Sequence, residues 1–214
     1  MWNRRHTMLL LLVIVLSVIG IWIGRIISGR IIVVDQLTRG LVDQLADTYF
    51  YTVFRWITEL GSGTFLTPFT VIVAFIVWRS FRDWLPALVF GLGTLGSHGL
   101  NVLIKHLVAR ERPSIFIAAN AEGFSFPSGH AMIPMVCYGL LAYFLTKKIT
   151  SSKSVFIIQF SLALLIFLIG ISRYVINVHY LTDVLAGFVF GFLYLIGIII
   201  LYEKLQSVRR KSPT

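Results

Sequence analysis

The hydrophobic pattern of this chain consists of six long apolar runs separated by shorter polar segments. The runs cover residues 7–28, 64–78, 84–106, 130–146, 154–171 and 180–202. A helix needs about 20 residues to cross a hydrocarbon core of about 30 Å. The second run is the shortest, and we expect Trp78 and the threonine-rich turn before the run to complete a tilted span. The pattern therefore predicts an all-α polytopic membrane protein, a bundle of about six transmembrane helices.

The first run follows Arg4 and Arg5, so its start resembles that of a signal peptide. Its apolar stretch is longer than a usual signal-peptide core, and no small-x-small cleavage site clearly follows it. We therefore expect an uncleaved first span.

Residues 29–62 have an amphipathic pattern. Apolar and charged side chains repeat at helical spacing on different faces. The apolar positions are Val34, Leu37, Leu41, Leu45 and Tyr49, and the charged positions are Asp35, Arg39, Asp43 and Asp47. We therefore expect a helix lying at the membrane surface on the outer side. Charges four residues apart support one another on a wet face, so we interpret them as surface pairs rather than as a site.

The third run, ALVFGLGTLGSHGLNVLIKH, contains four glycines, at positions 91, 93, 96 and 99. Apolar side chains gain little from leaving lipid, so small residues that permit close backbone contact favour helix association in membranes. We therefore expect this span to be a central helix of the bundle. Its residues His98, Asn101 and Lys105 share one helical face, which predicts a polar stripe running inward from Lys105.

Composition agrees with insertion into a membrane. Of the 214 residues, 57% are hydrophobic and 13% are charged, whereas soluble domains contain roughly 45–50% apolar residues. No polar linker divides the chain, so we expect one domain over residues 1–214. The net charge of +10 would indicate nucleic acid in a soluble protein. Here the distribution of the charges explains it better, and we expect no nucleic-acid partner.

Six spans place both termini on the same side of the membrane. The flanks on that side hold eleven basic and two acidic residues, whereas the other side holds eight basic and seven acidic residues. The positive-inside rule assigns the first set to the cytoplasm. We therefore expect a multi-pass protein of the cell membrane with both termini in the cytoplasm. The extracytoplasmic side then holds Lys105, Arg112, Arg173, His130 and His179.

The first polar cluster is KHLVARERP, at the end of the third run. Lys105 and Arg112 are seven residues apart, which puts both on one face of a helix. Pro113 disfavours helical geometry at Arg112, so the helix should end there. Either cation alone would be explained by snorkelling to lipid headgroups. We interpret Arg110 and Glu111 as rim or loop charges.

The second cluster is FPSGH, at the start of the fourth run. Pro127 and Ser128 suit a helix beginning, and Gly129 allows another group to approach the backbone. The free N–H groups of a helix N-terminus bind anions, phosphate above all. Read alone, the stretch is only a helix cap, but His130 at the mouth of a span needs a polar partner.

The third cluster is SRYVINVHYLTD, between the fifth and sixth runs. Arg173 ends the fifth run, and His179 and Asp183 lie one helical turn apart. A carboxylate at that spacing accepts the imidazole Nδ1–H and leaves the Nε2 lone pair available. A histidine in that state suits a nucleophile that forms a covalent intermediate. The alternative is that the pair merely holds the helix end.

Together the clusters place three cations, two histidines, one carboxylate and a helix N-terminus on one side of the membrane. Phosphoryl transfer mainly requires neutralisation of charge on the phosphate oxygens. A second histidine can then protonate the leaving oxygen. The set supplies each part without a metal, and nothing in the sequence resembles a metal-binding carboxylate cluster. We therefore expect neither a metal site nor a cofactor.

These clusters contain three motifs that resemble those of the type 2 phosphatidic acid phosphatase family, whose site is related to that of the vanadium haloperoxidases. The motifs stand as Lys105 through Arg112-Pro113, Pro127-Ser128-Gly129-His130, and Ser172-Arg173 through His179 to Asp183. All three are complete, in the family's order and with its spacing. The resemblance covers a motif-bearing core of about residues 60–200. It implies a six-span helical bundle with the site near the outer leaflet.

The resemblance also implies a role for each motif residue. His179 would attack phosphorus and become a phosphohistidine, and Asp183 would orient it. His130 would protonate the leaving alcohol and later help water to release phosphate. The phosphate oxygens would be bound by Lys105, Arg112, Arg173, Ser128 and Gly129. The implied activity is that of a metal-independent lipid phosphate phosphatase.

A site at the helix mouths suits a lipid whose phosphate lies at headgroup level and whose tail stays in the bilayer. The small size of the chain is similar to that of bacterial phosphatidylglycerophosphate phosphatases, so we favour conversion of phosphatidylglycerophosphate to phosphatidylglycerol. Related proteins act on undecaprenyl pyrophosphate, which is the first alternative. The second is a non-catalytic lipid-phosphate binder or transporter, in which the His179–Asp183 pair would be superfluous.

Overall fold

The computed structural model describes residues 3–45, 48–113 and 123–211. This part of the chain is helical and contains no strand. Its helices are α1 Arg4–Ile27, α2 Val33–Leu45, α3 Tyr49–Glu59, α4 Gly63–Phe81, α5 Trp84–Val108, α6 Gly129–Thr146, α7 Ser152–Val175 and α8 Leu181–Lys211. Those long and apolar enough to cross a membrane are α1, α4, α5, α6, α7 and α8. The prediction of an all-α polytopic bundle is therefore confirmed.

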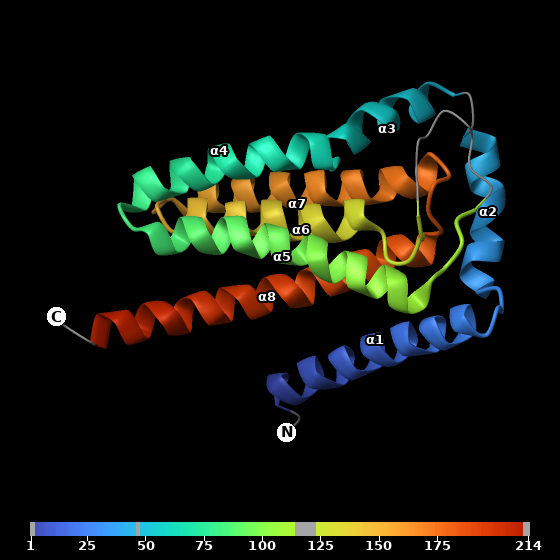
Figure 1. Ribbon diagram of the computed structural model, residues 1–214, viewed down its shortest axis with the longest axis horizontal. Helices are drawn as coiled ribbons and strands as arrows, with labels where there is room; N and C mark the ends of the chain where they lie inside the picture. Colours follow the sequence, from blue (N-terminus) through green and yellow to red (C-terminus); the bar gives the residue numbers. More distant parts are fainter. Residues whose placement is uncertain (1–2, 46–47, 114–122, 212–214) are drawn as a thin grey trace.

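The long helices run alongside one another, and α2 lies across one end of them (Figure 1). At that end, called the motif end below, α5 and α7 finish at Val108 and Val175, and α6 and α8 begin at Gly129 and Leu181. α1 begins and α8 ends at the opposite end (Figure 1). The alternating direction of the helices therefore brings the segments that carry the three polar clusters to the same end of the bundle.

The centre of the bundle is α6, which packs against α4, α5, α7 and α8. Although a larger share of α6 is buried, the glycine-rich α5 packs against α1, α4, α6 and α8, in line with the central position that its sequence predicted. Only part of its glycine content serves packing. An added Cβ atom would lie 3.0 Å or less from a neighbouring side chain at Gly93 and Gly96, but it would meet nothing within 4 Å at Gly91 and Gly99.

α8 packs closely on α6 through Gly187 and Gly191. A Cβ atom at Gly187 would lie 2.7 Å from the carbonyl oxygen of Ser128, and one at Gly191 would lie 2.7 Å from that of Met132. Small residues four apart allow two backbones to approach in this way in a membrane. The N-terminus of α8 is thereby joined to that of α6, and the Ser128 N–H donates to the carbonyl of Asp183 at 3.0 Å.

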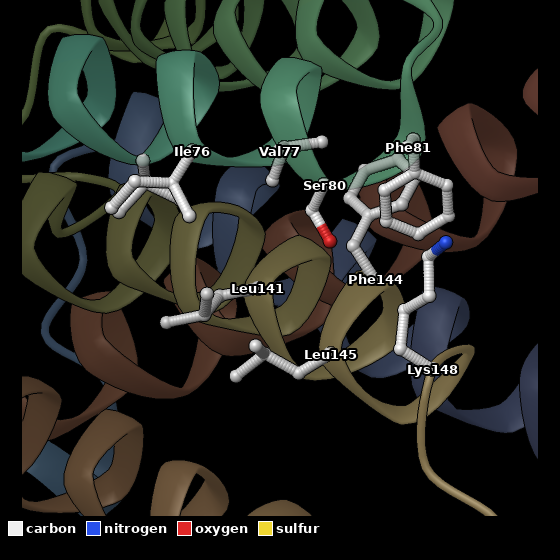
Figure 2. A pocket seen from close by; sticks show the side chains of 9 residues that line it. Ile76, Val77, Ser80, Phe81, Leu141, Phe144, Leu145 and Lys148 are labelled. Carbon is white, nitrogen blue, oxygen red and sulfur yellow. The ribbon is translucent and has the colours of Figure 1, made fainter.

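An apolar cavity of about 230 Å³ lies between α4 and α6 (Figure 2). Its lining residues come from the C-terminal parts of both helices, which lie opposite the motif end, and from Lys148 just after α6. Beside the cavity, the ammonium group of Lys148 lies 4.5 Å from the centroid of the Phe81 ring. The lining residues are Val73, Ile76, Val77, Ser80, Phe81, Leu141, Phe144, Leu145 and Lys148. None of them belongs to a polar cluster, so this cavity has no part in the candidate site.

The segment between the first two spans differs from the single interfacial helix that its pattern predicted. It forms two helices, α2 and α3, and Thr48 is the N-cap of the second. Leu37 and Leu41 are 76% and 55% exposed, whereas Asp35 is buried. The expectation that these charges lie on a wet face is therefore wrong for Asp35, because this carboxylate has partners inside the protein. Asp47 lies outside the described residues.

Candidate active site

Each of the three clusters contributes side chains from a helix end at the motif end of the bundle. They are Lys105 in the last turn of α5, Ser128 at the N-cap of α6, Arg173 in the last turn of α7 and Asp183 in the first turn of α8. Arg112 follows α5, and His179 lies in the short connection between α7 and α8. The predicted site residues therefore converge, and their contacts define the site.

His179 and Asp183 form the pair that their spacing predicted. His179 Nδ1 lies 3.4 Å from Asp183 Oδ2, and both residues are buried. The N–H groups of Val178 and His179 both donate to the carbonyl of Arg173, which closes the turn before α8. Asp183 Oδ2 also accepts from the N–H of Tyr180 at 3.0 Å, as an acidic residue does in a capping box. The carboxylate thus holds both the imidazole and the start of the helix.

Arg112 reaches the other ring nitrogen of His179. Its Nη1 lies 3.2 Å from His179 Nε2 and donates to the carbonyl of Val178 at 2.9 Å. Its Nε donates to the carbonyl of Gly123 at 2.9 Å. These backbone contacts hold the guanidinium against the imidazole, where it can meet an anion that approaches Nε2.

The other two cations are also anchored by the protein. Lys105 Nζ donates to the carbonyl of Phe124. Arg173 Nη1 donates to Thr58 Oγ1 on α3 at 3.0 Å, which brings α3 into the wall of the site. Arg173 Nε is buried and has no hydrogen-bond partner among the described residues. An unpaired buried donor costs free energy, so this group is suited to a bound anion.

Ser128 is the N-cap of α6, but its hydroxyl does not cap the helix. In the described part of the chain this Oγ is buried without a hydrogen-bond partner. The segment is held from α5, because Asn101 Nδ2 donates to the carbonyl of Pro127 at 3.2 Å. A Cβ atom at Gly129 would lie 3.1 Å from Asn101 Oδ1, so the close packing here favours glycine. The start of α6 therefore offers a hydroxyl and N–H groups that the helix itself does not use.

His130 lies in the first turn of α6 and is partly buried. It packs beside Gly61, where an added Cβ atom would lie 3.1 Å from His130 Cδ2. The groups that interact with it electrostatically are Arg173, His179, Arg112 and Lys105. The second histidine thus belongs to the same cluster as the first.

The surroundings of His179 favour its neutral form. Burial lowers the pKa of His179 well below its usual value, and the charges of Arg112, Arg173 and Lys105 lower this pKa further. The imidazole is therefore uncharged at pH 7. A neutral imidazole has the lone pair that a nucleophile requires.

Three residues that hold the site were not identified from the sequence. Arg110, interpreted as a rim or loop charge, is instead nearly buried: Nη1 lies 2.6 Å from Asp183 Oδ1 and Nη2 lies 2.7 Å from Asp35 Oδ2. That interpretation is wrong because two buried carboxylates flank the guanidinium. Thr58 has no distinguishing feature in the sequence, and Asp35 has the spacing of a surface charge. The only available signal was the position of Arg110 between two motif cations.

Within the residues that the structure describes, no group of three or more His, Cys, Asp or Glu side chains is placed to hold a metal ion. Cys137 is buried in α6 and is a free thiol. The charged groups around His179 are mainly donors, and charge-assisted hydrogen bonds from Arg and Lys suit phosphate oxygens. The arrangement is therefore chemically suited to a phosphate group.

Comparison with known proteins identifies relatives over most of the chain. Residues 86–207 match the PAP2 superfamily. The chain is 37% identical over 166 residues to phosphatidylglycerophosphatase B of Bacillus subtilis, covering 74% of this chain and 78% of that protein. It is 27% identical over 167 residues to dolichyldiphosphatase of Saccharomyces cerevisiae, covering 72% and 70% respectively.

The fold is also similar to that of a solved structure. A transmembrane PAP2 type phosphatidylglycerolphosphate phosphatase from Bacillus subtilis superposes with a TM-score of 0.76 at 27% identity, covering 88% of this chain and 96% of that one. The family resemblance carried by the three motifs is confirmed by these matches. This chain belongs to the PAP2 superfamily.

Proposed function

We propose that this protein is a lipid phosphatase that removes phosphate from a membrane lipid without a metal ion. The observation that carries the proposal is the contact of His179 with both Asp183 and Arg112 at the motif end of a membrane bundle. One ring nitrogen faces a carboxylate and the other faces a cation suited to phosphate. The relatives that bear the names of lipid phosphatases support the same activity.

In the proposed mechanism the substrate phosphate binds between Arg112, Lys105 and Arg173, with the Ser128 hydroxyl and the Gly129 N–H completing the contacts. These donors neutralise charge on the phosphate oxygens. The Nε2 lone pair of His179 forms a bond to phosphorus while the bond between phosphorus and the alcohol oxygen breaks.

Two other groups complete the reaction. Asp183 accepts the Nδ1–H and stabilises the charge that develops on the ring of His179. His130, protonated while the anionic phosphate offsets the surrounding cations, gives its proton to the departing alcohol. The neutral His130 then takes a proton from water, which attacks the phosphohistidine, breaks the P–N bond and releases inorganic phosphate. At the end of the cycle both histidines are restored to their starting states.

An apolar groove supports a lipid rather than a soluble substrate. It has a volume of about 680 Å³, runs between α4 and α5, and includes Ile133 of α6. Gly61 lines it at the motif end and packs against His130. We propose that an acyl or prenyl chain of the substrate lies in this groove while its phosphate is at the site. His98, predicted on the polar stripe, lines the groove and is exposed.

We propose phosphatidylglycerophosphate as the substrate, because a relative of 37% identity has the name phosphatidylglycerophosphatase B. A prenyl diphosphate such as undecaprenyl pyrophosphate is the second candidate, favoured by the similarity to a protein named dolichyldiphosphatase. The test is phosphate release by the purified protein in detergent from phosphatidylglycerophosphate, phosphatidate and undecaprenyl pyrophosphate. The substrate with the highest kcat/KM identifies the class.

The variant His179→Ala decides between catalysis and simple binding. We expect its phosphate release to fall to background, because no nucleophile remains, while its melting temperature shows that the protein is folded. His106→Ala is the matched control, because His106 is exposed on α5 outside the cluster. Full activity of folded His179→Ala would refute the mechanism. A wild-type protein that binds but never hydrolyses these lipids would point to the binder or transporter.

We also propose that residues 1–214 form one membrane domain with both termini in the cytoplasm and the site on the extracytoplasmic face. Charge distribution supports this orientation. Cys137 is fully buried, so single cysteines can be added without removing it. The variant Arg55→Cys on α3 should react with an impermeant thiol reagent in intact cells, and Lys153→Cys should react only after lysis. The reverse pattern would invert the proposed orientation.

A further inference from the structure

Arg110 and Asp35 form a charged network next to the His179–Asp183 pair. The side chain of Arg110 is 10% exposed and that of Asp35 is 1% exposed. Arg110 Nη1 donates to Asp183 Oδ1 at 2.6 Å, and Arg110 Nη2 donates to Asp35 Oδ2 at 2.7 Å. One guanidinium therefore joins the carboxylate that faces His179 to a carboxylate on α2.

Asp35 also binds the start of α8. Its Oδ1 accepts from the backbone N–H of Thr182 at 3.0 Å, and its Oδ2 accepts from Thr182 Oγ1 at 2.6 Å. The N–H groups in the first turn of a helix have no partner within the helix and are normally satisfied by the N-cap side chain. Tyr180, which precedes α8, has no such acceptor, so Asp35 supplies it from another helix.

The guanidinium of Arg110 is held on its remaining sides as well. Its Cζ lies 3.9 Å from the centroid of the Tyr180 ring, and its Nη1 also donates to Thr182 Oγ1 at 2.9 Å. The two oxygens of Asp183 then have separate partners: Oδ1 binds Arg110, and Oδ2 faces His179 Nδ1 and the Tyr180 N–H. With both oxygens engaged, the carboxylate cannot rotate away from the imidazole without breaking a buried ion pair.

We propose that Arg110 and Asp35 are positioning residues that hold the Asp183 carboxylate against His179. Because Asp35 is on α2, this helix then contributes to the active site. This inference rests on the proposed phosphatase function. Neither residue touches the phosphate in the proposed mechanism. They act through Asp183, so their loss should slow the chemical step more than it weakens substrate binding.

The network also affects how readily the His179–Asp183 pair binds a proton. Removal of the positive charge of Arg110 makes a proton on the pair more favourable. When that proton is on His179, Nε2 has no lone pair for attack on phosphorus, so the variant should lose activity at a higher pH than the wild type as the pH falls. The other titratable or charged groups that face the pair are Arg112 after α5, Lys105 on α5, His130 on α6 and Arg173 on α7. All of these are unchanged in the variants below, so a shift of the acid limb reports on the Arg110 network.

The test compares Arg110→Gln, Asp35→Asn and their double variant in detergent, with the lipid phosphate that the wild type hydrolyses, between pH 5 and pH 9, about two units either side of neutrality. We expect Arg110→Gln to lower kcat by about 10- to 100-fold, with KM changed much less, and to move the acid limb to higher pH. Asp35→Asn should do the same to a smaller degree. The double variant should be no slower than Arg110→Gln, because residues in one network are not additive. Arg110→Lys should restore part of kcat.

Asp43→Asn is the matched control, since Asp43 is exposed on the same helix and should behave as wild type. If Arg110→Gln fails to fold, because it leaves two buried carboxylates without their cation, Asp35→Asn decides. Folded variants with wild-type kcat and an unshifted acid limb would overturn the inference and leave the phosphatase function standing. A wild type that hydrolyses no lipid phosphate would refute the proposed function itself, and the positioning role with it.

Discussion

Arg112 and His179 are in direct contact, with the guanidinium Nη1 3.2 Å from the imidazole Nε2. Arginine only donates hydrogen bonds, so Nε2 is the acceptor and carries the lone pair. The ring proton is then on Nδ1, which faces Asp183 Oδ2 at 3.4 Å. The two neighbours of His179 thus select the tautomer that a nucleophile needs. They also direct its lone pair toward the cation proposed to bind the phosphate.

Two replacements of Arg112 should distinguish the contribution of its charge to activity from the contribution of its guanidinium geometry. We expect Arg112→Gln to lower kcat/KM by about 10²- to 10³-fold, as loss of one donor to developing charge does in other enzymes. Arg112→Lys keeps the charge but cannot bind the carbonyls of Gly123 and Val178 and reach Nε2 at once. It should therefore recover only part of the loss. Steady-state kinetics measure this, and near-normal rates for Arg112→Gln would contradict the proposed role.

The lowered pKa of His179 predicts the acid side of the pH profile. Burial and the charges of Arg112 and Arg173 keep the imidazole neutral below the usual histidine pKa of about 6.5. The acid limb of kcat/KM should therefore lie below that value. It should move to higher pH in Arg112→Gln, because one positive charge is removed. Both proteins are assayed with the same substrate, so ionisation of the substrate cancels in the comparison.

The same shift has a consequence for stability. The unfolded chain takes up a proton on His179 below about pH 6.5, whereas the folded protein takes it up only at lower pH. The contribution of His179 to stability is therefore fully present above that pH and is lost as the pH falls. The melting temperature should fall less between pH 7 and pH 5.5 in folded His179→Ala than in the wild type. An equal fall in both proteins would show that His179 is not buried in its neutral form.

Ser128 and Ser62 are both N-cap residues, but their replacement by alanine should have opposite effects on stability and activity. The Ser62 hydroxyl accepts from the Phe65 N–H at 3.2 Å, whereas the Ser128 hydroxyl makes no capping bond. Ser62→Ala should cost about 0.5–2 kcal/mol of stability and leave kcat/KM unchanged. Ser128→Ala should leave stability nearly unchanged and lower kcat/KM, because the hydroxyl is proposed to bind phosphate. Thermal unfolding and phosphate release measure the two effects. If Ser128 had only a structural role, Ser128→Ala would instead lower the stability and leave kcat/KM unchanged.

Chelators should have little effect on activity. In the proposed mechanism Lys105, Arg112 and Arg173 neutralise the phosphate oxygens, which is the task a metal ion performs in many phosphatases. Three clustered cations would also repel a divalent metal. Activity in excess EDTA should therefore stay within about twofold of the untreated value. Loss of activity that Mg²⁺ restores would count against this mechanism.

Features that depend on local spacing could be predicted from the sequence. The six spans follow from the length of the apolar runs, and the approach of His179 to Asp183 follows from one helical turn. Contacts between distant segments could not be predicted in this way. Asp35 has the spacing of an exposed charge, and its burial depends on α2 lying across the motif end, where it meets Arg110 and Thr182. No local pattern encodes that placement.

Glycine content was an equally incomplete guide to packing. The four glycines of α5 predicted a central helix, and α5 does pack against α1, α4, α6 and α8, but they did not indicate that α6 is more enclosed. The glycines that allow close packing on α6 are Gly187 and Gly191, which belong to α8 and not to α6. Small residues allow another helix to pack closely, but their number does not indicate which face of the helix is packed. That face depends on the positions of all the other helices, which cannot be obtained from the composition of one helix.

The glycine face of α8 should therefore be essential to the site as well as to the fold. In Gly187→Val the added side chain would meet the Ser128 carbonyl, 2.7 Å from the Cβ position. It would push α8 from α6 and break the hydrogen bond from Ser128 N–H to the Asp183 carbonyl. We expect a loss of about 1–3 kcal/mol in stability together with most of the activity.

Gly197→Val on the same helix provides the matched control. An added Cβ atom at Gly197 meets nothing within 4 Å, so this variant should keep both its melting temperature and its phosphate release. Because the two variants add the same side chain to one helix, a difference between them isolates the contact at Ser128. Equal behaviour of the two proteins would mean that α8 can shift without disturbing Asp183, and the site would then not depend on this close approach.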